Sequence, residues 1–372
     1  MSEQDEKDIK LAPILLVNVG TVFGGAEVYI ARLATLLAGR VRLTAFCGHS
    51  GLADQLRAAG VTVFQLPLLR WRRLNRAAKY LTALLAMIYL VFRYRIRFVH
   101  FNGYQTSYLI PIAKLMRATA LITPHHLPDS EWFRRWYKVT ARWAAGSINV
   151  SHVMDQTHRE LLPLLPSIVI PNWAPQPKDT PVILSPTPKR RLLFIGRLVS
   201  NKGLSTLLDA IGEFDQAMEL LVCGEGPLRE QFESHAKGLP VKFLGYAPEL
   251  HRLYPEVDAL VIPSLGPEGS SLVALEAMAY GLPCIMSDLP VFREIAENGK
   301  AALIFRAGEA RDLVRAIRQL TVDREQAIVM AKYARSLWER EYSEQSVKSK
   351  YISLLCEFQS GTLRELNSRT AP

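Results

Sequence analysis

The chain has few cysteines and lacks several short motifs that mark large enzyme classes. Its four cysteines are widely spaced and have neither metal-ligand nor redox spacing, which indicates reduced core residues of a cytosolic protein. They are Cys47, Cys223, Cys284 and Cys356. No Asp-x-Asp pair occurs that could hold a metal ion. No Gly-x-Gly-x-x-Gly run occurs either, which argues against a dinucleotide-binding fingerprint.

Long hydrophobic segments are also absent. The longest uncharged apolar run, from Tyr80 to Phe92, would make about 20 Å of helix, short of the roughly 30 Å core of a bilayer. We therefore predict a buried helix here in preference to a transmembrane one. The first ten residues are polar and acidic, so no signal peptide is expected and the predicted location is cytoplasmic.

Positive charge is concentrated in the first half of the chain. Residues 1–180 hold 22 Lys and Arg against 11 Asp and Glu, whereas residues 181–372 hold 23 against 24. One basic cluster flanks the apolar run: Arg70, Arg72, Arg73, Arg76, Lys79, Arg93, Arg95 and Arg97. A second, rich in aromatics, comprises Trp132, Phe133, Arg134, Arg135, Trp136, Lys138, Arg142 and Trp143. Both suit an anionic membrane surface or an anionic acceptor, and a solvated basic face is the alternative. No nucleic-acid-binding motif is present, so nucleic acid is not an expected partner.

The order of apolar segments predicts two α/β domains. Strand-like runs at residues 13–19, 41–47, 61–66, 98–101, 120–123 and 147–150 alternate with helical patterns, which favours a parallel, doubly wound sheet. Ligands are then expected beyond the carboxyl ends of the strands. A proline-rich stretch follows, and the α/β pattern resumes at Leu192. The predicted boundaries are 1–173 for the first domain, 174–190 for a linker, 191–345 for the second domain and 346–372 for a C-terminal helix.

The stretch from Ile262 to Pro283 carries the most specific signal. A loop rich in Gly, Pro and Ser precedes a helix that Ser270 or Ser271 can cap. The unpaired N–H groups of the first helical turn form a site for an anion such as a diphosphate. Glu268 and Glu276 flank this turn and could accept hydrogen bonds from hydroxyls. Either glutamate by itself would more often be a solvated surface residue.

The E-x7-E pair formed by Glu268 and Glu276, together with the surrounding LEAMA-x-G-x-P run, resembles the signature of retaining glycosyltransferases of group 1 (family 4). Further matching runs are Gly24-Gly25-Ala26-Glu27, Thr123-Pro124-His125, Val169-Ile170-Pro171-Asn172, Gly196-Arg197 with Lys202-Gly203, and Gly224-Glu225-Gly226-Pro227. The chain departs from the pattern at His126, where Asp is usual, and near Glu294, where two glycines are missing. The resemblance implies the GT-B architecture, with two Rossmann-like, doubly wound domains facing a cleft. It also implies that the last helix returns to the first domain through Leu354, Leu355 and Phe358.

The resemblance also implies residue roles. It assigns the donor nucleotide sugar to Gly24, Gly25, Arg197, Lys202, Gly224, Gly226, Tyr246, Gly269, Ser270, Ser271, Leu272 and Glu276. It assigns the transfer step to His125, Glu268, Arg197 and Lys202. In this scheme Arg197 and Lys202 bind the diphosphate, and Glu276 binds the ribose. Glu268 and His125, from opposite domains, hold the transferred sugar.

The implied activity is transfer of a sugar from a UDP- or GDP-linked donor to a glycan or lipid-linked saccharide, with retention and with no metal or other cofactor. The basic clusters favour a lipid-linked acceptor and peripheral attachment at the inner membrane face. Three alternatives stay open. One is a non-catalytic GT-B binding or assembly subunit of a glycan biosynthesis complex. The others are an NAD-dependent oxidoreductase and a phosphorylase-like enzyme of the same architecture.

Overall fold

The computed structural model describes residues 11–20, 23–65, 76–128, 130–178, 182, 184–185, 187–214, 218–247 and 249–360. Arg70, Arg72 and Arg73 of the first basic cluster lie outside these ranges, as do the side chains of Arg76 and Lys79 and part of the proline-rich stretch. The chain divides into two compact units. The first comprises residues Met1–Pro171 and Lys348–Pro372, and the second comprises Asn172–Val347.

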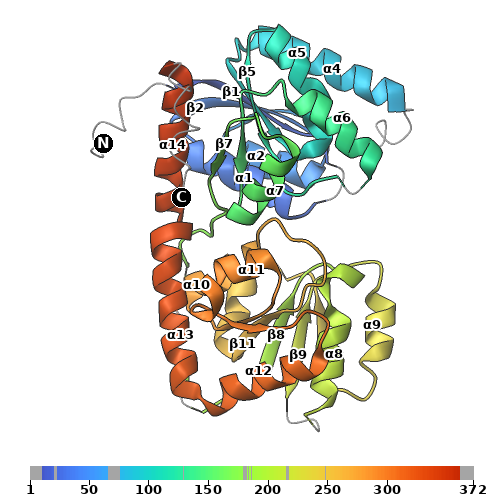
Figure 1. The fold of residues 1–372 in the computed structure, drawn as a ribbon, viewed down its shortest axis with the longest axis vertical. Helices are drawn as coiled ribbons and strands as arrows, with labels where there is room; N and C mark the ends of the chain where they lie inside the picture. Colours follow the sequence, from blue (N-terminus) through green and yellow to red (C-terminus); the bar gives the residue numbers. More distant parts are fainter. Residues whose placement is uncertain are drawn as a thin grey trace. The chain divides into compact units, whose positions relative to one another are not determined.

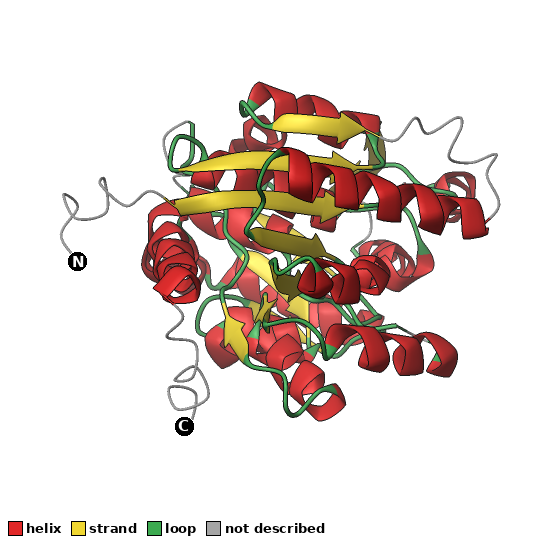
Figure 2. Cartoon of the chain, turned by 90° about the horizontal axis from the view of Figure 1, so that it is seen from above, coloured by secondary structure: helices red, strands yellow, loops and turns green. Residues whose placement is uncertain are grey.

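The first unit contains a seven-stranded parallel sheet in the order β3-β2-β1-β4-β5-β6-β7 (Figure 1). Its strands are β1 (Leu11–Asn18), β2 (Val41–Cys47), β3 (Thr62–Gln65), β4 (Phe98–Asn102), β5 (Thr119–Thr123), β6 (Gly146–Asn149) and β7 (Ser167–Val169). Its helices are α1 (Gly25–Leu37), α2 (Ser50–Ala58), α4 (Arg76–Arg93), η1 (Tyr104–Leu109), α5 (Ile110–Leu115), α6 (Glu131–Ala141) and α7 (His152–Leu161). The central strands are almost wholly buried, because helices cover them as a doubly wound sheet requires (Figure 2).

The second unit contains a six-stranded parallel sheet in the order β10-β9-β8-β11-β12-β13. Its strands are β8 (Arg191–Ile195), β9 (Glu219–Cys223), β10 (Val241–Gly245), β11 (Ala259–Ile262), β12 (Cys284–Ser287) and β13 (Leu303–Phe305). Its helical segments are η2 (Ser200–Lys202), α8 (Leu204–Gly212), α9 (Arg229–His235), η3 (Leu250–Glu256), α10 (Leu272–Tyr280), α11 (Pro290–Ile295), η4 (Glu297–Gly299), α12 (Ala310–Val322), α13 (Arg324–Leu337) and η5 (Trp338–Tyr342). The predicted α/β class with two doubly wound sheets is confirmed.

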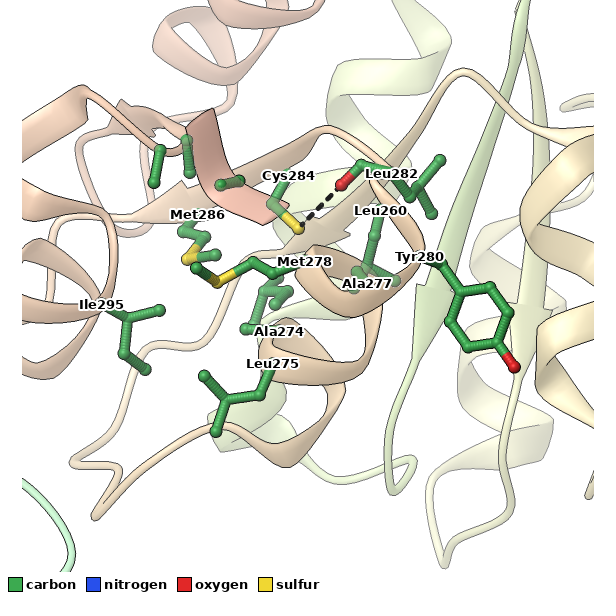
Figure 3. Close-up of a cluster of buried hydrophobic side chains, with 14 of the residues drawn as sticks. Leu260, Ala274, Leu275, Ala277, Met278, Tyr280, Leu282, Cys284, Met286 and Ile295 are labelled. Carbon is green, nitrogen blue, oxygen red and sulfur yellow. Dashed lines mark hydrogen bonds between the residues drawn. The ribbon is translucent and has the colours of Figure 1, made fainter. Parts of the chain in front are cut away.

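Helix α10 lies in the core of the second unit and not on its surface. Ala274, Ala277 and Met278 are buried along with Leu275, which leaves only a small part of the helix exposed (Figure 3). Small alanines let the helix approach the sheet closely, and Cys284 of β12 lies in the same cluster. Burial raises the pKa of the Cys284 thiol to about 12, so this cysteine is a neutral core residue.

A buried ion pair lies at the amino-terminal end of the second sheet, where β8 begins. The Arg324 guanidinium donates to Asp258 over 2.7 Å, and both side chains are almost completely buried. Asp258 also accepts hydrogen bonds from the backbone N–H groups of Lys189 and Arg191, at 3.1 and 3.2 Å. The carboxylate thus ties the end of the proline-rich stretch to β8 and to the start of α13.

Helix α14 (Glu344–Ser360) contributes to the first unit from Lys348 onwards. Leu354, Leu355 and Phe358 are all buried, and the Phe358 ring lies 6.4 Å from that of Phe98 in β4. The Tyr351 hydroxyl is hydrogen-bonded to the Tyr29 hydroxyl of α1. This part of α14 is therefore an integral layer of the first unit.

The helix predicted over Tyr80–Phe92 is present, but the prediction that it is buried is wrong for one of its two sides. Ala83, Met87 and Leu90 of α4 are buried against the sheet. Apolar side chains on the opposite side of the helix are exposed, because no described element covers them. Among the described residues, no helix is both long and apolar enough to cross a membrane.

Candidate functional site

Three loops meet at the carboxyl edge of the second sheet. The loop after β8 and the loop after β11 are joined by a hydrogen bond from the Leu265 N–H to the Asn201 carbonyl, at 2.8 Å. Gly203 makes this approach feasible, because its φ is +69° and a Cβ there would lie 1.8 Å from the Pro263 carbonyl oxygen. The two loops therefore form one surface beyond the strands, where ligands bind in doubly wound sheets.

The loop after β9 is held against the loop after β8 in the same way. A Cβ at Gly224 would lie 1.9 Å from the Gly196 carbonyl oxygen, and one at Gly226 would lie 2.4 Å from that of Leu198. The Leu198 N–H donates to the Glu225 carbonyl at 3.0 Å. Gly224 and Gly226, predicted from the family pattern to line the nucleotide pocket, thus have a packing role that by itself requires glycine.

Lys202 and Glu268, which were predicted to bind different parts of the donor, form an ion pair with each other. The Ser264 hydroxyl donates to the same Glu268 oxygen at 2.9 Å, and the Ser287 hydroxyl donates to the Ser264 carbonyl at 2.7 Å. Both members of the pair are only partly exposed. The pair places one positive and one negative group side by side on the interlocked loops.

Arg197 follows β8 at the same edge and is exposed. It makes no ion pair with any residue in the described part of the chain. Tyr246 follows β10, and its side chain is 78% exposed. These two predicted donor residues therefore present accessible side chains at the sheet edge.

The amino end of α10 adds a positive potential. The Ser271 hydroxyl accepts a hydrogen bond from the Ala274 N–H at 3.3 Å, so this side chain caps the helix. The backbone around Gly269, Ser270 and Leu272 is half-buried, and N–H groups of a first helical turn have no intrahelical acceptor. Glu276 lies one turn further along and is also half-buried. The helix end can attract an anion through its dipole and its backbone.

In the first unit, the predicted Gly24-Gly25 turn opens α1 and is shaped by a buried carboxyl group. Glu27 accepts a hydrogen bond from the Gly24 N–H at 3.0 Å and one from the Asn18 amide at 3.4 Å. Burial raises the pKa of Glu27, partly offset by these hydrogen bonds. Glu27 therefore fixes the conformation of the glycine turn.

His125 lies just beyond β5 and is oriented by Asn102, the last residue of β4. The Asn102 amide donates to the Ala26 carbonyl at 2.9 Å, which leaves its oxygen to accept from the His125 Nε2–H at 2.7 Å. His125 is therefore assigned the Nε2–H tautomer, with Nδ1 as an acceptor. Burial lowers its pKa to about 3, and repulsion from His100 and His126 contributes, so the ring is neutral at neutral pH.

A second layer of hydrogen bonds lies beneath His125. The Tyr29 ring packs edge-on against the His125 ring, with centroids 4.7 Å apart. The Tyr29 hydroxyl lies 3.4 Å from that of Thr123, which lies 3.0 Å from His100 Nε2. Burial also lowers the pKa of His100, to about 4. This end of the first sheet is a network of neutral groups that holds the His125 ring in one orientation.

Sequence reasoning did not assign a role to Asn102 or Ser264. Asn102 stands opposite Thr123 in the pairing of β4 with β5. A polar residue at the carboxyl end of a buried strand, next to a strand that ends in a candidate site, is a signal that could have found it. Ser264 likewise lies two residues beyond the end of β11 and four residues before Glu268.

Two family models match this chain. The model "Glycosyltransferase Family 4" matches residues 23–175, and the model "Glycosyl transferases group 1" matches residues 189–323. The chain belongs to the group 1 glycosyltransferases. The resemblance deduced from the E-x7-E pair is thereby confirmed, and the oxidoreductase alternative loses its basis.

Solved structures show that this group 1 chain has the GT-B fold. HepE of Anabaena, crystallised with UDP and glucose, has a TM-score of 0.79 at 16% identity and covers 93% of this chain and 99% of its own. Sucrose-phosphate synthase of Thermosynechococcus elongatus has a TM-score of 0.80 at 20% identity and covers 94% of this chain and 100% of its own.

Curated relatives match a smaller part of the chain. Sulfoquinovosyl transferase of Arabidopsis thaliana is 31% identical over 157 residues, which cover 41% of this chain and 30% of the relative. Phosphatidyl-myo-inositol mannosyltransferase of Mycobacterium leprae is 34% identical over 136 residues, which cover 34% of this chain and 36% of the relative. The matches thus span about a third of the length of these relatives.

Proposed function

We propose that this protein transfers a sugar from a UDP- or GDP-linked donor to a glycan or lipid-linked saccharide, with retention and without a metal ion. The observation that carries the proposal is the grouping of Arg197, Lys202, Glu268 and the amino end of α10 on interlocked loops at one sheet edge. The name of HepE, solved with UDP and glucose, supports a nucleotide-sugar donor. The name of the phosphatidyl-myo-inositol mannosyltransferase supports a lipid-linked acceptor.

The donor diphosphate is bound by positive groups. The Arg197 guanidinium offers a planar fork for phosphate oxygens, and the Lys202 ammonium offers a point charge. The first turn of α10 adds backbone N–H groups around Gly269 to Leu272. Together they stabilise the negative charge that develops on the leaving phosphate, the task that a metal ion performs in other transferases. Glu276 accepts hydrogen bonds from the ribose hydroxyls, and Tyr246 lies beside the base.

The transferred sugar is held by acceptor groups. Glu268 accepts hydrogen bonds from its hydroxyls, and its ion pair with Lys202 places this carboxylate next to the diphosphate. In the first unit, neutral His125 offers Nδ1 as an acceptor for a substrate hydroxyl. In the proposed front-side step, the leaving phosphate oxygen takes the electron pair of the C1–O bond. The acceptor hydroxyl oxygen bonds to C1 on the same face, and its proton passes to the leaving phosphate.

Calorimetry against UDP, GDP and NAD, with and without EDTA, tests the donor assignment. Binding of UDP or GDP should survive EDTA. It should weaken by about ten- to a hundredfold in Lys202→Ala, because a charge-assisted contact is lost. Lys237→Ala, at an exposed lysine elsewhere in the second unit, is the matched control and should bind normally. Binding of NAD, or of no nucleotide, would refute the proposal.

Measurements of donor hydrolysis distinguish a catalytic transferase from a non-catalytic assembly subunit. The wild-type protein should slowly hydrolyse its nucleotide-sugar donor, and proton NMR should show the released sugar first in the anomeric configuration of the donor. His125→Ala should retain nucleotide binding and lose turnover. Tight nucleotide binding without any turnover of UDP- or GDP-linked sugars would favour the assembly subunit.

A further inference from the structure

Helix α6 exposes a stripe of large apolar side chains. Trp132, Trp136, Val139 and Trp143, the last just beyond the helix end, are 43% to 65% exposed. Their spacing of four, three and four residues places them on one side of the helix. The Trp132 and Trp136 rings stack, with centroids 6.2 Å apart and an interplanar angle of 2°. The stripe is thus an ordered surface and not a set of scattered side chains.

The helix is attached to its unit by a different and narrower side. Of its residues, only Tyr137, Thr140 and Ala141 are buried. The Thr140 hydroxyl donates to the Ser107 hydroxyl of η1 at 3.0 Å. A helix on the surface of a soluble domain normally has polar residues on its solvent-facing side. The exposed tryptophan stripe of α6 departs from this pattern, and such apolar patches mark binding surfaces.

Helix α4 carries a second stripe of the same kind. Leu81, Leu85, Tyr89 and Phe92 are 54% to 72% exposed on the side opposite its buried residues. Both helices contact η1, because the Tyr80 ring of α4 lies 4.7 Å from the Tyr108 ring and Thr140 of α6 is bonded to Ser107. We call these eight residues of α4 and α6 the exposed apolar face.

Positive charge borders the exposed apolar face. The basic residues in and just after α6 lie on a third side of the helix, away from both the tryptophan stripe and the buried residues. All four are exposed: Arg134, Arg135, Lys138 and Arg142. Arg93 closes α4 and is also exposed. The single acidic residue of α6, Glu131, is paired with Arg135. Tryptophan beside arginine and lysine on one helix is the composition that suits the boundary between lipid headgroups and acyl chains.

We propose that the first unit docks on an anionic lipid bilayer through the exposed apolar face, with the α6 tryptophans and Phe92 inserted at the headgroup boundary. The basic residues bind lipid phosphates, and the apolar stripes leave water. A protein partner or a second copy would need a complementary acidic rim, whereas an anionic bilayer supplies that charge directly. This docking deepens the lipid-linked acceptor of the proposed function, although vesicle binding itself needs neither donor nor acceptor.

Co-sedimentation with vesicles of phosphatidylcholine, with and without phosphatidylglycerol, tests the proposal. The full chain should bind the anionic vesicles, with a blue shift of tryptophan fluorescence. The triple variant Trp132→Ser/Trp136→Ser/Trp143→Ser should lower the partition coefficient by at least about tenfold, because indole burial is lost. Leu164→Ser removes an apolar side chain that is 93% exposed elsewhere in the first unit, and it should bind as the wild type does.

Three results would overturn the proposal. One is the absence of binding to anionic vesicles. Another is binding that falls in Lys138→Glu/Arg142→Glu but is unchanged in the tryptophan variant, which would mean electrostatic adsorption without insertion. The third is a dimer in solution that the tryptophan variant converts to monomer, which would mean that a second copy covers the face. Far-UV circular dichroism of the same variants reports their folding without relying on nucleotide binding, which keeps this test separate from that of the donor site.

Discussion

In the second unit, Arg197 and the Lys202–Glu268 pair stand on loops held together by backbone contacts at glycines. In the first unit, His125 and His100 sit in a buried network in which burial lowers both histidine pKa values, to about 3 and about 4. The described residues at one sheet edge include an ion pair, whereas those around His125 at the other edge are neutral rings, hydroxyls and an amide. The difference fits the roles proposed above, because a diphosphate needs positive charge and hydroxyls need oriented neutral partners. Three experiments test this difference between the two units, and they are given in order of decreasing expected effect.

Removing a buried charge should damage the second unit most. Asp258→Ala leaves the Arg324 guanidinium buried without its carboxylate, so the unit should lose about 3–5 kcal/mol of stability. Amide hydrogen exchange at β8 and β11 measures this opening free energy within the unit. Glu249→Ala breaks an exposed pair with Arg252 at 3.2 Å and should cost about 1 kcal/mol or less. A loss that is equally small in Asp258→Ala would show that the buried pair does not hold this edge.

Acid should weaken the first unit through its buried histidines. Burial lowers the pKa of His100 and of His158 to about 4, so between about pH 6.5 and pH 4 the unfolded chain binds more protons than the folded unit. The stability they contribute is complete above about pH 6.5 and is lost as the pH falls toward 4. From about pH 7 to about pH 5 the loss should be about 2 kcal/mol for each histidine.

Hydrogen exchange at β4 and β6 across this range measures the effect. His158→Gln should reduce the loss, whereas a change at exposed His152 should not. The raised pKa of Glu27 acts in the opposite sense, and Glu27→Gln removes that contribution. A first unit whose stability does not change with pH would contradict the picture of a neutral network.

Freeing the His125 ring should have the smallest effect. Asn102→Ala removes the acceptor of the Nε2–H, so kcat should fall about tenfold while nucleotide affinity stays unchanged. Asn102→Asp restores an acceptor and adds a negative charge, which raises the pKa of His125. The acidic limb of its pH–rate profile should therefore move to higher pH. Equal losses of kcat and nucleotide affinity in Asn102→Ala would indicate general disruption and not a positioning role.

Much of the fold could be predicted because its signals are local. The apolar runs at residues 41–47, 98–101 and 120–123 coincide with β2, β4 and β5. Their lengths and their apolar composition are properties of short segments. The family match rests on equally local runs around Glu268 and Lys202. The assigned roles of these residues stay predictions.

Exposure could not be predicted, because it depends on what packs against a helix. Apolar spacing over Tyr80–Phe92 indicates a helix and says nothing about how many sides are covered. Leu85 and Phe92 face outward only because η1 and the sheet occupy the other side of α4. The aromatic-basic run from Trp132 to Trp143 was visible in the chain, but its division into three sides needed the buried contacts of Tyr137 and Thr140.

Local patterns in the amino-acid sequence were enough to predict the two doubly wound sheets, the family and the chemical types of residue at each sheet edge. Which of those residues contact one another depends on the tertiary structure. The pairing of Lys202 with Glu268, the ring orientation that Asn102 imposes on His125, and the bond between Asp258 and Arg324 each join positions far apart in the chain. Such contacts depend on strand order and loop approach, which set the distances between side chains and which no local pattern encodes.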